Sequence, residues 1–289
     1  MNDFTRPPMA ETMPIGRMLQ TLRGLSDAQI DEIVAYQRSH GLQFGEAAVA
    51  LRLASDDDIV GLISKQFHYP YDARSDAAAL PAELVVVKNP FSEGAELIRD
   101  LRTQLTMGPM RQAGAGRLLA VASGQSGDGK TFVAANLAAA FSQLGARTLL
   151  IDANMRQPRV GPLFGAARDS AGLSMILSGR AVKHAFHQAQ SLPNLFVLPA
   201  GPIPPNPQEL LQGAAFELLL DELRRDFAYV VIDTPAGDAG ADYRMVAARA
   251  DAVLVVARQD HTPYRSLAQV VKTLERGPAG LAGVVMNRY

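Results

Sequence analysis

The chain has 289 residues, which exceeds the usual length of a single domain, so two domains are expected. Its formal net charge of −1 gives no basic bias, so nucleic acid is not expected as a partner, and the absence of cysteine excludes disulfides and thiol chemistry. No apolar run approaches the roughly 18–20 residues that cross a bilayer, which predicts a cytoplasmic protein that reaches a membrane only through a partner.

The N-terminal part of the sequence predicts a short tail followed by a helical repeat. Residues 1–14 combine prolines with charged side chains and lack the apolar core of a signal peptide, so a flexible tail is expected. Two copies of one pattern follow at a constant offset of 29 residues (44 − 15 = 29), and in each copy a serine, Ser26 or Ser55, precedes an acidic turn and an apolar period of three to four. Residues 15–75 are therefore predicted to form a small helical domain of two helix–turn–helix units. The matched pairs include Ile15 and Phe44, Gly16 and Gly45, Leu19 and Ala48, Ile30 and Ile59, and Ile33 and Leu62.

The chain between this repeat and the next regular segment predicts a connection. Periodicity fades over residues 76–91 amid prolines, which is typical of a linker. A helix is predicted from about Ser92 to Thr106, and Gly108 followed by Pro109 predicts its end.

The rest of the sequence alternates between short apolar runs and helical stretches. The runs lack polar alternation, which is typical of strands that are buried on both faces of a parallel sheet. Strand–helix alternation at this spacing predicts a doubly wound, mostly parallel α/β sheet of P-loop type after the small helical N-terminal domain. The predicted strands cover residues 118–122, 148–151, 195–198, 229–232, 252–257 and 283–286.

A phosphate-binding loop pattern connects the first predicted strand to its helix. The segment Gly124-Gln-Ser-Gly-Asp-Gly129-Lys130-Thr131 has the required glycines, lysine and hydroxyl residue. Glycines let the backbone curl so that N–H groups converge on the β-phosphate, which also faces the positive end of the helix dipole. Lys130 adds a charge toward the β- and γ-phosphates, and Thr131 offers its hydroxyl to Mg²⁺, so ATP and Mg²⁺ are the expected cofactors. The predicted nucleotide-binding residues here are Gly124, Ser126, Gly127, Asp128, Gly129, Lys130, Thr131 and Phe132.

Polar residues end three of the predicted strands. Asp152 and Asp233 each close an apolar run, and ligands of parallel sheets bind at the carboxyl ends of strands, so both carboxylates are expected to face the nucleotide. Asp233 would partner a metal-bound water, and Asp152 is a candidate metal ligand or base. Asn287 either contacts adenine or only terminates its strand. The sequence therefore predicts a Mg²⁺ site at Thr131, Asp152 and Asp233, and a catalytic set of Lys130, Asp152 and Asp233.

Together these motifs resemble the Walker A, A′ and B set of bacterial tyrosine kinases. The second motif runs from Asp152 through Asn154 and Arg156 to Pro158, and the third is Asp233-Thr-Pro. The likeness runs from about residue 91 to residue 289 and is best for the subgroup encoded with exopolysaccharide chain-length determinant proteins. It predicts a P-loop tyrosine-kinase domain over residues 92–289.

Upstream of the P-loop strand, Glu96, Arg99 and Arg102 resemble the oligomerisation motif of this family. Their spacing of i, i+3 and i+6 places them on one face of the predicted helix, where they could pair across a subunit boundary.

The resemblance implies an ATP-dependent autokinase that assembles into a homo-oligomeric ring. A tyrosine from the C-terminal tail of one subunit would enter the site of its neighbour, and we hypothesise that Tyr289 is this phosphoacceptor. The cytoplasmic tail of a co-polymerase in the inner membrane would activate the kinase, and a phosphotyrosine phosphatase would reset it. Cycling between the two states would then affect polysaccharide polymerisation and export.

Two residues depart from the family pattern. Asn154 stands where the family usually has a second acid; its carbonyl can ligate a cation, but it brings no charge and is a poor base. Either Asp152 does the work, or turnover is reduced. The chain stops at Tyr289 directly after the last predicted strand, whereas the family typically has a cluster of tyrosines on a flexible tail.

Two alternatives share the predicted fold. ParA/MinD-type positioning ATPases carry a signature lysine five residues before the P-loop lysine, and Gln125 occupies that position. A catalytically weak, nucleotide-dependent scaffold would bind ATP and change its oligomeric state without transferring phosphate.

The repeat domain resembles the N-terminal domain of type II secretion ATPases, some of which bind cyclic di-GMP. Gly16 and Gly45 match glycines of their paired motifs, but Pro14 stands where the first motif carries arginine. A protein-docking or packing role is therefore favoured over cyclic di-GMP binding.

Overall fold

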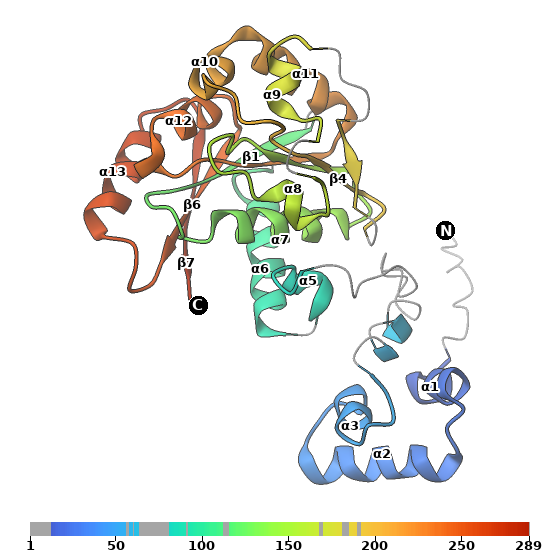
Figure 1. Cartoon of the computed structure of the whole chain (residues 1–289). Coiled ribbons are helices and arrows are strands. Elements are labelled where there is room, and N and C mark those ends of the chain that lie inside the picture. Colours follow the sequence, from blue (N-terminus) through green and yellow to red (C-terminus); the bar gives the residue numbers. More distant parts are fainter. Residues whose placement is uncertain are drawn as a thin grey trace, which may run out of the picture. The chain divides into compact units, whose positions relative to one another are not determined.

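The computed structural model describes residues 13–55, 58–59, 61–63, 81–90, 92–111, 116–167, 170–180, 185–189 and 192–288. The chain divides into two compact units, Met1–Ser75 and Asp76–Tyr289 (Figure 1). The predicted tail, apart from residues 13 and 14, lies outside the described residues. None of the described helices is both long and apolar enough to cross a membrane.

The N-terminal unit contains the helices α1 (Ile15–Arg23), α2 (Asp27–His40) and α3 (Phe44–Ala50). Both predicted serine caps are present: Ser26 accepts the backbone N–H of Gln29, and Ser55 accepts that of Asp58 at 3.2 Å. These side-chain oxygens satisfy amides that have no partner within their own helix. The core of this unit contains repeat positions from both copies, and its buried residues are Leu19, Ile33, Ala47, Ala48, Ile59 and Leu62.

The two repeated glycines lie where helices approach closely. A Cβ on Gly16 would contact the ring of Phe44 at 3.4 Å, and one on Gly45 would lie 2.6 Å from Cγ2 of Ile59. The second distance is shorter than any real carbon contact, so only glycine fits there without a shift of the neighbouring side chain. Packing within the unit therefore accounts for Gly45, whereas a Cβ at Gly16 would make an ordinary contact.

The C-terminal unit is built on a seven-stranded sheet with the order β3-β4-β2-β5-β1-β6-β7. All neighbours are parallel except β3, which pairs antiparallel with β4. All six predicted strands are present, and the predicted doubly wound, mostly parallel fold is confirmed. The strands are β1 (Arg117–Ser123), β2 (Thr148–Asp152), β3 (His187–Gln188), β4 (Leu195–Leu198), β5 (Tyr229–Asp233), β6 (Ala252–Arg258) and β7 (Gly280–Asn287).

Helices cover both faces of this sheet (Figure 1). On one face α7 (Lys130–Ser142) packs against β1, β2 and β5, and α6 (Glu93–Met107) packs on the outer side of α7. Because it is enclosed on both sides, α7 is apolar and buried all round, with Phe132 alone of its residues half-buried. On the other face the helices share one apolar core with the strands. They are α9 (Leu173–Leu177), α10 (Pro207–Gln212), α11 (Ala214–Asp226), α12 (Asp242–Ala247) and α13 (Tyr264–Leu274).

Part of the predicted linker is folded. Residues 81–90, within the stretch 76–91 that was predicted to be a connection, contain the short helix α5 (Val85–Lys88), which contacts α6 and α7. Val86 and Val87 are fully buried. The side chain of Asn136 on α7 holds the backbone of this segment, because its amide donates to the carbonyl of Glu83 at 2.8 Å and its oxygen accepts the N–H of Val86 at 3.2 Å.

We expect Asn136→Ala to lower the free energy of unfolding by about 1–3 kcal/mol, because it leaves a buried N–H and a buried carbonyl without partners. Urea unfolding of the full chain, followed by circular dichroism, measures the change. The matched control is Gln104→Ala, which removes an exposed hydrogen bond to Asp100 on α6 and should change stability by less than about 0.5 kcal/mol. Equal losses in the two variants would contradict the prediction.

Candidate functional site

The phosphate-binding loop lies between the carboxyl end of β1 and the first turn of α7. Gly127 and Gly129 have φ angles of 88° and 96°, in the left-handed region that favours glycine. A Cβ on Gly124 would lie 2.5 Å from Oγ of Ser266, so this glycine permits a close approach to α13. The motif glycines are thus required by backbone geometry and by packing.

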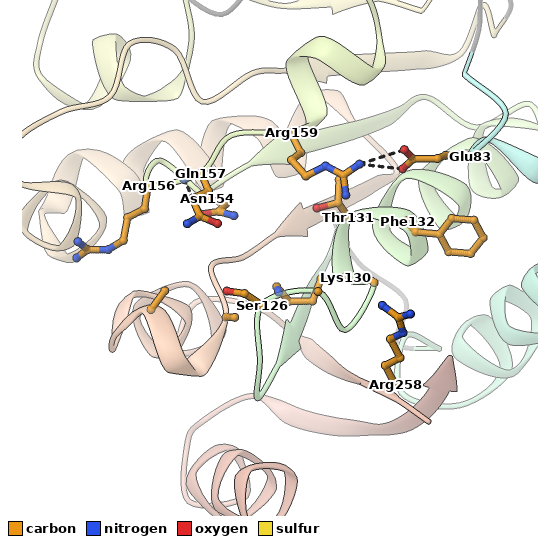
Figure 2. A pocket seen from close by; sticks show the side chains of 14 residues that line it. Glu83, Ser126, Lys130, Thr131, Phe132, Asn154, Arg156, Gln157, Arg159 and Arg258 are labelled. Carbon is orange, nitrogen blue, oxygen red and sulfur yellow. Dashed lines mark hydrogen bonds and ion pairs between the residues drawn. The ribbon is translucent and has the colours of Figure 1, made fainter. Parts of the chain in front are cut away.

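A cleft of about 480 Å³ opens over this loop (Figure 2). Cationic side chains reach it from three segments: Lys130 from the loop, Arg156 and Arg159 from the segment after β2, and Arg258 from the end of β6. Such a cleft is suited to a polyanion. The complete lining is Glu83, Ser126, Gly127, Gly129, Lys130, Thr131, Phe132, Asn154, Arg156, Gln157, Arg159, Ala236, Ala239 and Arg258.

The two predicted acids lie side by side on neighbouring strands. Asp152 of β2 is the direct register partner of Asp233 of β5, and both are fully buried. Asp152 accepts backbone N–H groups from Asn154, Arg159 and Val160 at 3.0–3.1 Å. These bonds fix the course of the loop after β2, so Asp152 organises the segment that carries the cleft residues Asn154, Arg156 and Arg159.

Burial dominates the protonation of this pair. It raises the pKa of Asp152 to about 8, helped by the neighbouring charge of Asp233 and opposed by the three backbone N–H groups. It raises the pKa of Asp233 to about 6, against the opposing effects of the Thr131 hydroxyl, Lys130 and Arg159. Burial also lowers the pKa of Lys130, opposed by Asp233, Asp128 and Asp238. Without a cation, the carboxyl pair therefore holds a proton at neutral pH.

The geometry around Asp233 fits a divalent cation. Thr131 donates its hydroxyl hydrogen to Oδ2 of Asp233 at 2.7 Å, while Oδ1 is buried with no hydrogen-bond partner among the described residues. A hydroxyl oxygen and an unsatisfied carboxylate oxygen at the phosphate loop are the hard donors that Mg²⁺ prefers. No group of three His, Cys, Asp or Glu side chains in the described part of the chain could hold a metal ion. Phosphate oxygens and water would have to complete the coordination.

Two predicted nucleotide-binding residues have other roles in this structure. The buried side chain of Asp128 accepts the N–H of Gln125 at 2.9 Å and the hydroxyl of Thr262 at 2.5 Å, so it braces the loop from within. Asn287 donates its amide to the backbone carbonyl of Asp128 at 3.2 Å. Neither side chain lines the cleft. Asn287 supports the phosphate loop at the end of its strand, and its contact with adenine stays a prediction.

The sequence did not single out Asp238 as a site residue. Its carboxylate accepts both the N–H of Ser126 at 2.9 Å and the Ser126 hydroxyl at 3.1 Å. The ring Nε2 of His261 lies 3.1 Å from the carbonyl oxygen of Ser126. An acidic residue five positions after a strand-ending aspartate was the only available signal.

The segment after β2 contributes Asn154 and Arg156. Oδ1 of Asn154 accepts the N–H of Gln157 at 3.2 Å, which closes a local turn. The guanidinium of Arg156 makes two bonds to the buried carboxylate of Asp242, at 2.7 and 3.2 Å, and this raises the pKa of Arg156. Arg156 therefore ties the loop after β2 to α12.

The predicted oligomerisation residues are not among those that line the cleft. Glu96, Arg99 and Arg102 lie on α6; Arg99 pairs with Glu96 and donates to the carbonyl of Pro90 at 2.5 Å, and Arg102 donates to the carbonyl of Ala140 at 2.9 Å. The Glu96 side chain is 66% exposed. The proposed acceptor Tyr289 lies outside the described residues.

The raised pKa of Asp152 predicts how stability without ligands depends on pH. The folded state keeps this proton up to about pH 8, whereas an aspartate in the unfolded chain has an ordinary pKa of 3.8, so the unfolded state binds fewer protons between these values. Stability should therefore fall as pH rises from about 4 to about 8, and Asp152→Asn should reduce that slope. Urea unfolding at several pH values, without nucleotide or Mg²⁺, measures both slopes.

The matched control is Asp226→Asn, which changes an exposed aspartate at the end of α11 and should keep the wild-type slope. An Asp152→Asn variant with an unchanged slope would contradict the assignment.

Comparison with known proteins agrees with this geometry. Residues 119–289 match the family model of the CobQ/CobB/MinD/ParA nucleotide binding domain. Tyrosine-protein kinase YwqD of Bacillus subtilis is 31% identical over 215 residues, which are 74% of this chain and 89% of YwqD. EpsB of Ralstonia solanacearum is 34% identical over 204 residues, which are 71% of this chain and 27% of EpsB.

A solved structure shows the same relationship. The chimerical protein CapA2B2 superimposes with a TM-score of 0.67 at 31% identity, over 72% of this chain and 91% of that chain. The chain spans only about a quarter of EpsB but most of YwqD and CapA2B2. Since the family model covers more than half of the chain and YwqD is matched over most of its length, this chain belongs to the bacterial tyrosine kinase family, within the CobQ/CobB/MinD/ParA group of P-loop proteins.

Proposed function

We propose that the chain is a protein-tyrosine autokinase that uses ATP and Mg²⁺. The observation that carries the proposal is the cleft over the phosphate loop, which Lys130 and Thr131 line together with other cationic side chains. Asp233 does not line the cleft but bonds to Thr131 behind it, and the buried Asp152 lies beside Asp233. This arrangement can bind a triphosphate and accept a proton at one edge of a sheet.

In this proposal the residues have separate roles. Loop N–H groups and Lys130 hold the β- and γ-phosphates, and Thr131 with Asp233 would hold Mg²⁺, which neutralises phosphate charge. The tyrosine oxygen attacks the γ-phosphorus, the bond from phosphorus to the β–γ bridging oxygen breaks, and ADP leaves. The tyrosine proton passes to Asp152. Burial raises the pKa of Asp152 toward neutral pH, and Mg²⁺ would displace the proton that the pair holds without a cation, so that Asp152 could accept one from the tyrosine.

The acceptor is proposed to be Tyr289 of a neighbouring subunit in a ring, with the Glu96, Arg99 and Arg102 face of α6 at the subunit boundary. The large exposed fraction of Glu96 supports the last point. The wider role is proposed from the family resemblance. It comprises control of exopolysaccharide chain length and export together with a membrane co-polymerase, at the cytoplasmic side of the inner membrane, with a phosphatase that resets the kinase.

One observation favours a second candidate, a nucleotide-dependent scaffold with weak or no transfer. The carbonyl oxygen of Asn154 accepts a backbone N–H, so it is engaged in the turn after β2. The position that usually carries a second acid thus adds no charge, and its side-chain oxygen is not available to a cation in this conformation. Tight ATP binding without ADP formation, in the presence of the co-polymerase tail, would identify the scaffold.

We expect Lys130→Met to reduce autophosphorylation by at least about 100-fold, because it removes charge that stabilises the transferring phosphoryl group. Incorporation of radiolabelled phosphate from Mg-ATP into the full chain measures this. The matched control is Lys272→Met, which changes an exposed lysine on α13 and should leave labelling unchanged. Full labelling of Lys130→Met would rule out the proposed site.

We expect Tyr289→Phe to abolish most of the label, because this tyrosine is the proposed acceptor. Tyr264 is the matched control, since its side chain is 83% exposed at the start of α13 and is therefore open to a kinase. Phosphopeptide mapping of both variants decides between them. Label that persists in Tyr289→Phe and disappears in Tyr264→Phe would move the acceptor to Tyr264.

A further inference from the structure

An ion pair at the edge of the cleft connects the folded part of the predicted linker to the kinase site. Nη2 of Arg159 donates to both carboxylate oxygens of Glu83, at 3.0 and 3.1 Å (Figure 2). The two residues are 76 positions apart in the sequence, and both line the cleft.

Glu83 is held in place by buried side chains of α7. Its backbone carbonyl accepts the Asn136 amide at 2.8 Å, and three residues later the carbonyl of Val86 accepts the amide of Gln143 at 3.1 Å. Asn136 is fully buried and Gln143 is 5% exposed. Because α7 begins at the phosphate loop, the same helix positions both the loop and the Glu83 carboxylate.

Arg159 is fixed at its other end to the pair of acids. Its backbone N–H donates to Oδ2 of Asp152 at 3.0 Å. Its side chain lines the same cleft as Lys130 and as Thr131 of the predicted Mg²⁺ site. A terminal phosphate held beside Lys130 and Thr131 would therefore lie in the cleft that this guanidinium lines.

The exposure of the pair determines what it can do. The side chains of Arg159 and Glu83 are 60% and 44% exposed, whereas Arg156 is bound to an almost fully buried carboxylate. An exposed ion pair contributes at most about 1 kcal/mol, so Glu83 can orient Arg159 without sequestering it from a phosphate. The pair uses only Nη2 of the guanidinium, whose five N–H donors suit simultaneous contact with a second anion.

We propose that Arg159 binds the terminal phosphate of the nucleoside triphosphate and that Glu83 is the positioning residue that holds its guanidinium over the cleft. This inference rests on the proposed use of ATP. The chain thereby carries, on residues 81–90, a determinant of triphosphate recognition that lies outside the three phosphate-site motifs.

The test compares affinities of the full chain for AMP-PNP and for ADP, each with Mg²⁺, by isothermal titration calorimetry. Arg159→Ala should weaken AMP-PNP binding by at least about tenfold and ADP binding by less than about twofold, because only the triphosphate has the contacted group. Glu83→Gln should weaken AMP-PNP binding by about two- to fivefold, again without a matching change for ADP. Glu83→Asp, which keeps the charge, should recover part of the loss.

A double variant separates positioning from a general structural effect. In the Arg159→Ala background, Glu83→Gln should cause no further loss, since Glu83 acts through Arg159. Glu275→Gln, which changes an exposed carboxylate after α13, is the matched control and should keep both affinities.

Three results would overturn the inference. They are an unchanged AMP-PNP affinity in Glu83→Gln, equal losses of AMP-PNP and ADP affinity in Arg159→Ala, or tighter AMP-PNP binding in Glu83→Gln. The last would show that Glu83 competes with the phosphate. A wild-type chain that binds neither nucleotide would instead refute the proposed function, and this inference with it.

Discussion

Two like charges are forced together by the strand register, and the rest of the site is arranged around that fact. Asp152 and Asp233 are direct partners on β2 and β5, at the buried carboxyl edge of a parallel sheet. Two adjacent buried carboxylates cannot both ionise without compensation. Backbone N–H groups, the Thr131 hydroxyl and Lys130 supply part of it, and a proton supplies the rest. A divalent cation at the proposed site would replace that proton, which would couple cation binding to proton release at this edge.

The phosphate loop is braced by groups from distant parts of the chain. Thr262 binds the side chain of Asp128 from the segment after β6, Asn287 binds its carbonyl from the end of β7, and Asp238 binds Ser126 from the segment after β5. Because the backbone is ordered in advance, less conformational entropy is lost when an anion binds. The conformation of the loop therefore depends on residues along the whole edge of the sheet as well as on its own glycines.

The sequence predicted those parts of the molecule that depend on local pattern. Apolar runs without alternation located six strands, and spacing located the phosphate loop and the two strand-ending aspartates. Strand β3 was missed because two polar residues carry no periodicity, and its pairing with β4 depends on a contact made elsewhere in the fold. Prolines around residues 81–90 predicted a linker. The same stretch contains α5, however, and its valines Val86 and Val87 are buried.

Contacts between polar residues far apart in the sequence could not be predicted in this way. Arg159 with Glu83 and Ser126 with Asp238 are separated by 76 and 112 positions, and nothing in the local sequence specifies which polar side chains meet. Asn287 illustrates the converse case. Its position at the end of a strand was read correctly, but only the folded structure shows that its amide is directed to the backbone of the phosphate loop.

Because α5 is buried against α7, the folded unit that carries the phosphate loop begins before α6. Val86 and Val87 complete the covering of α7, and Asn136 and Gln143 bond to the same short segment. A fragment that began at α6 would expose apolar side chains along α7 and leave the polar side chains of Asn136 and Gln143 without these partners. The phosphate loop lies at the first turn of α7. A stable fragment must therefore include Glu83 and α5 as well as the segment that the motifs cover.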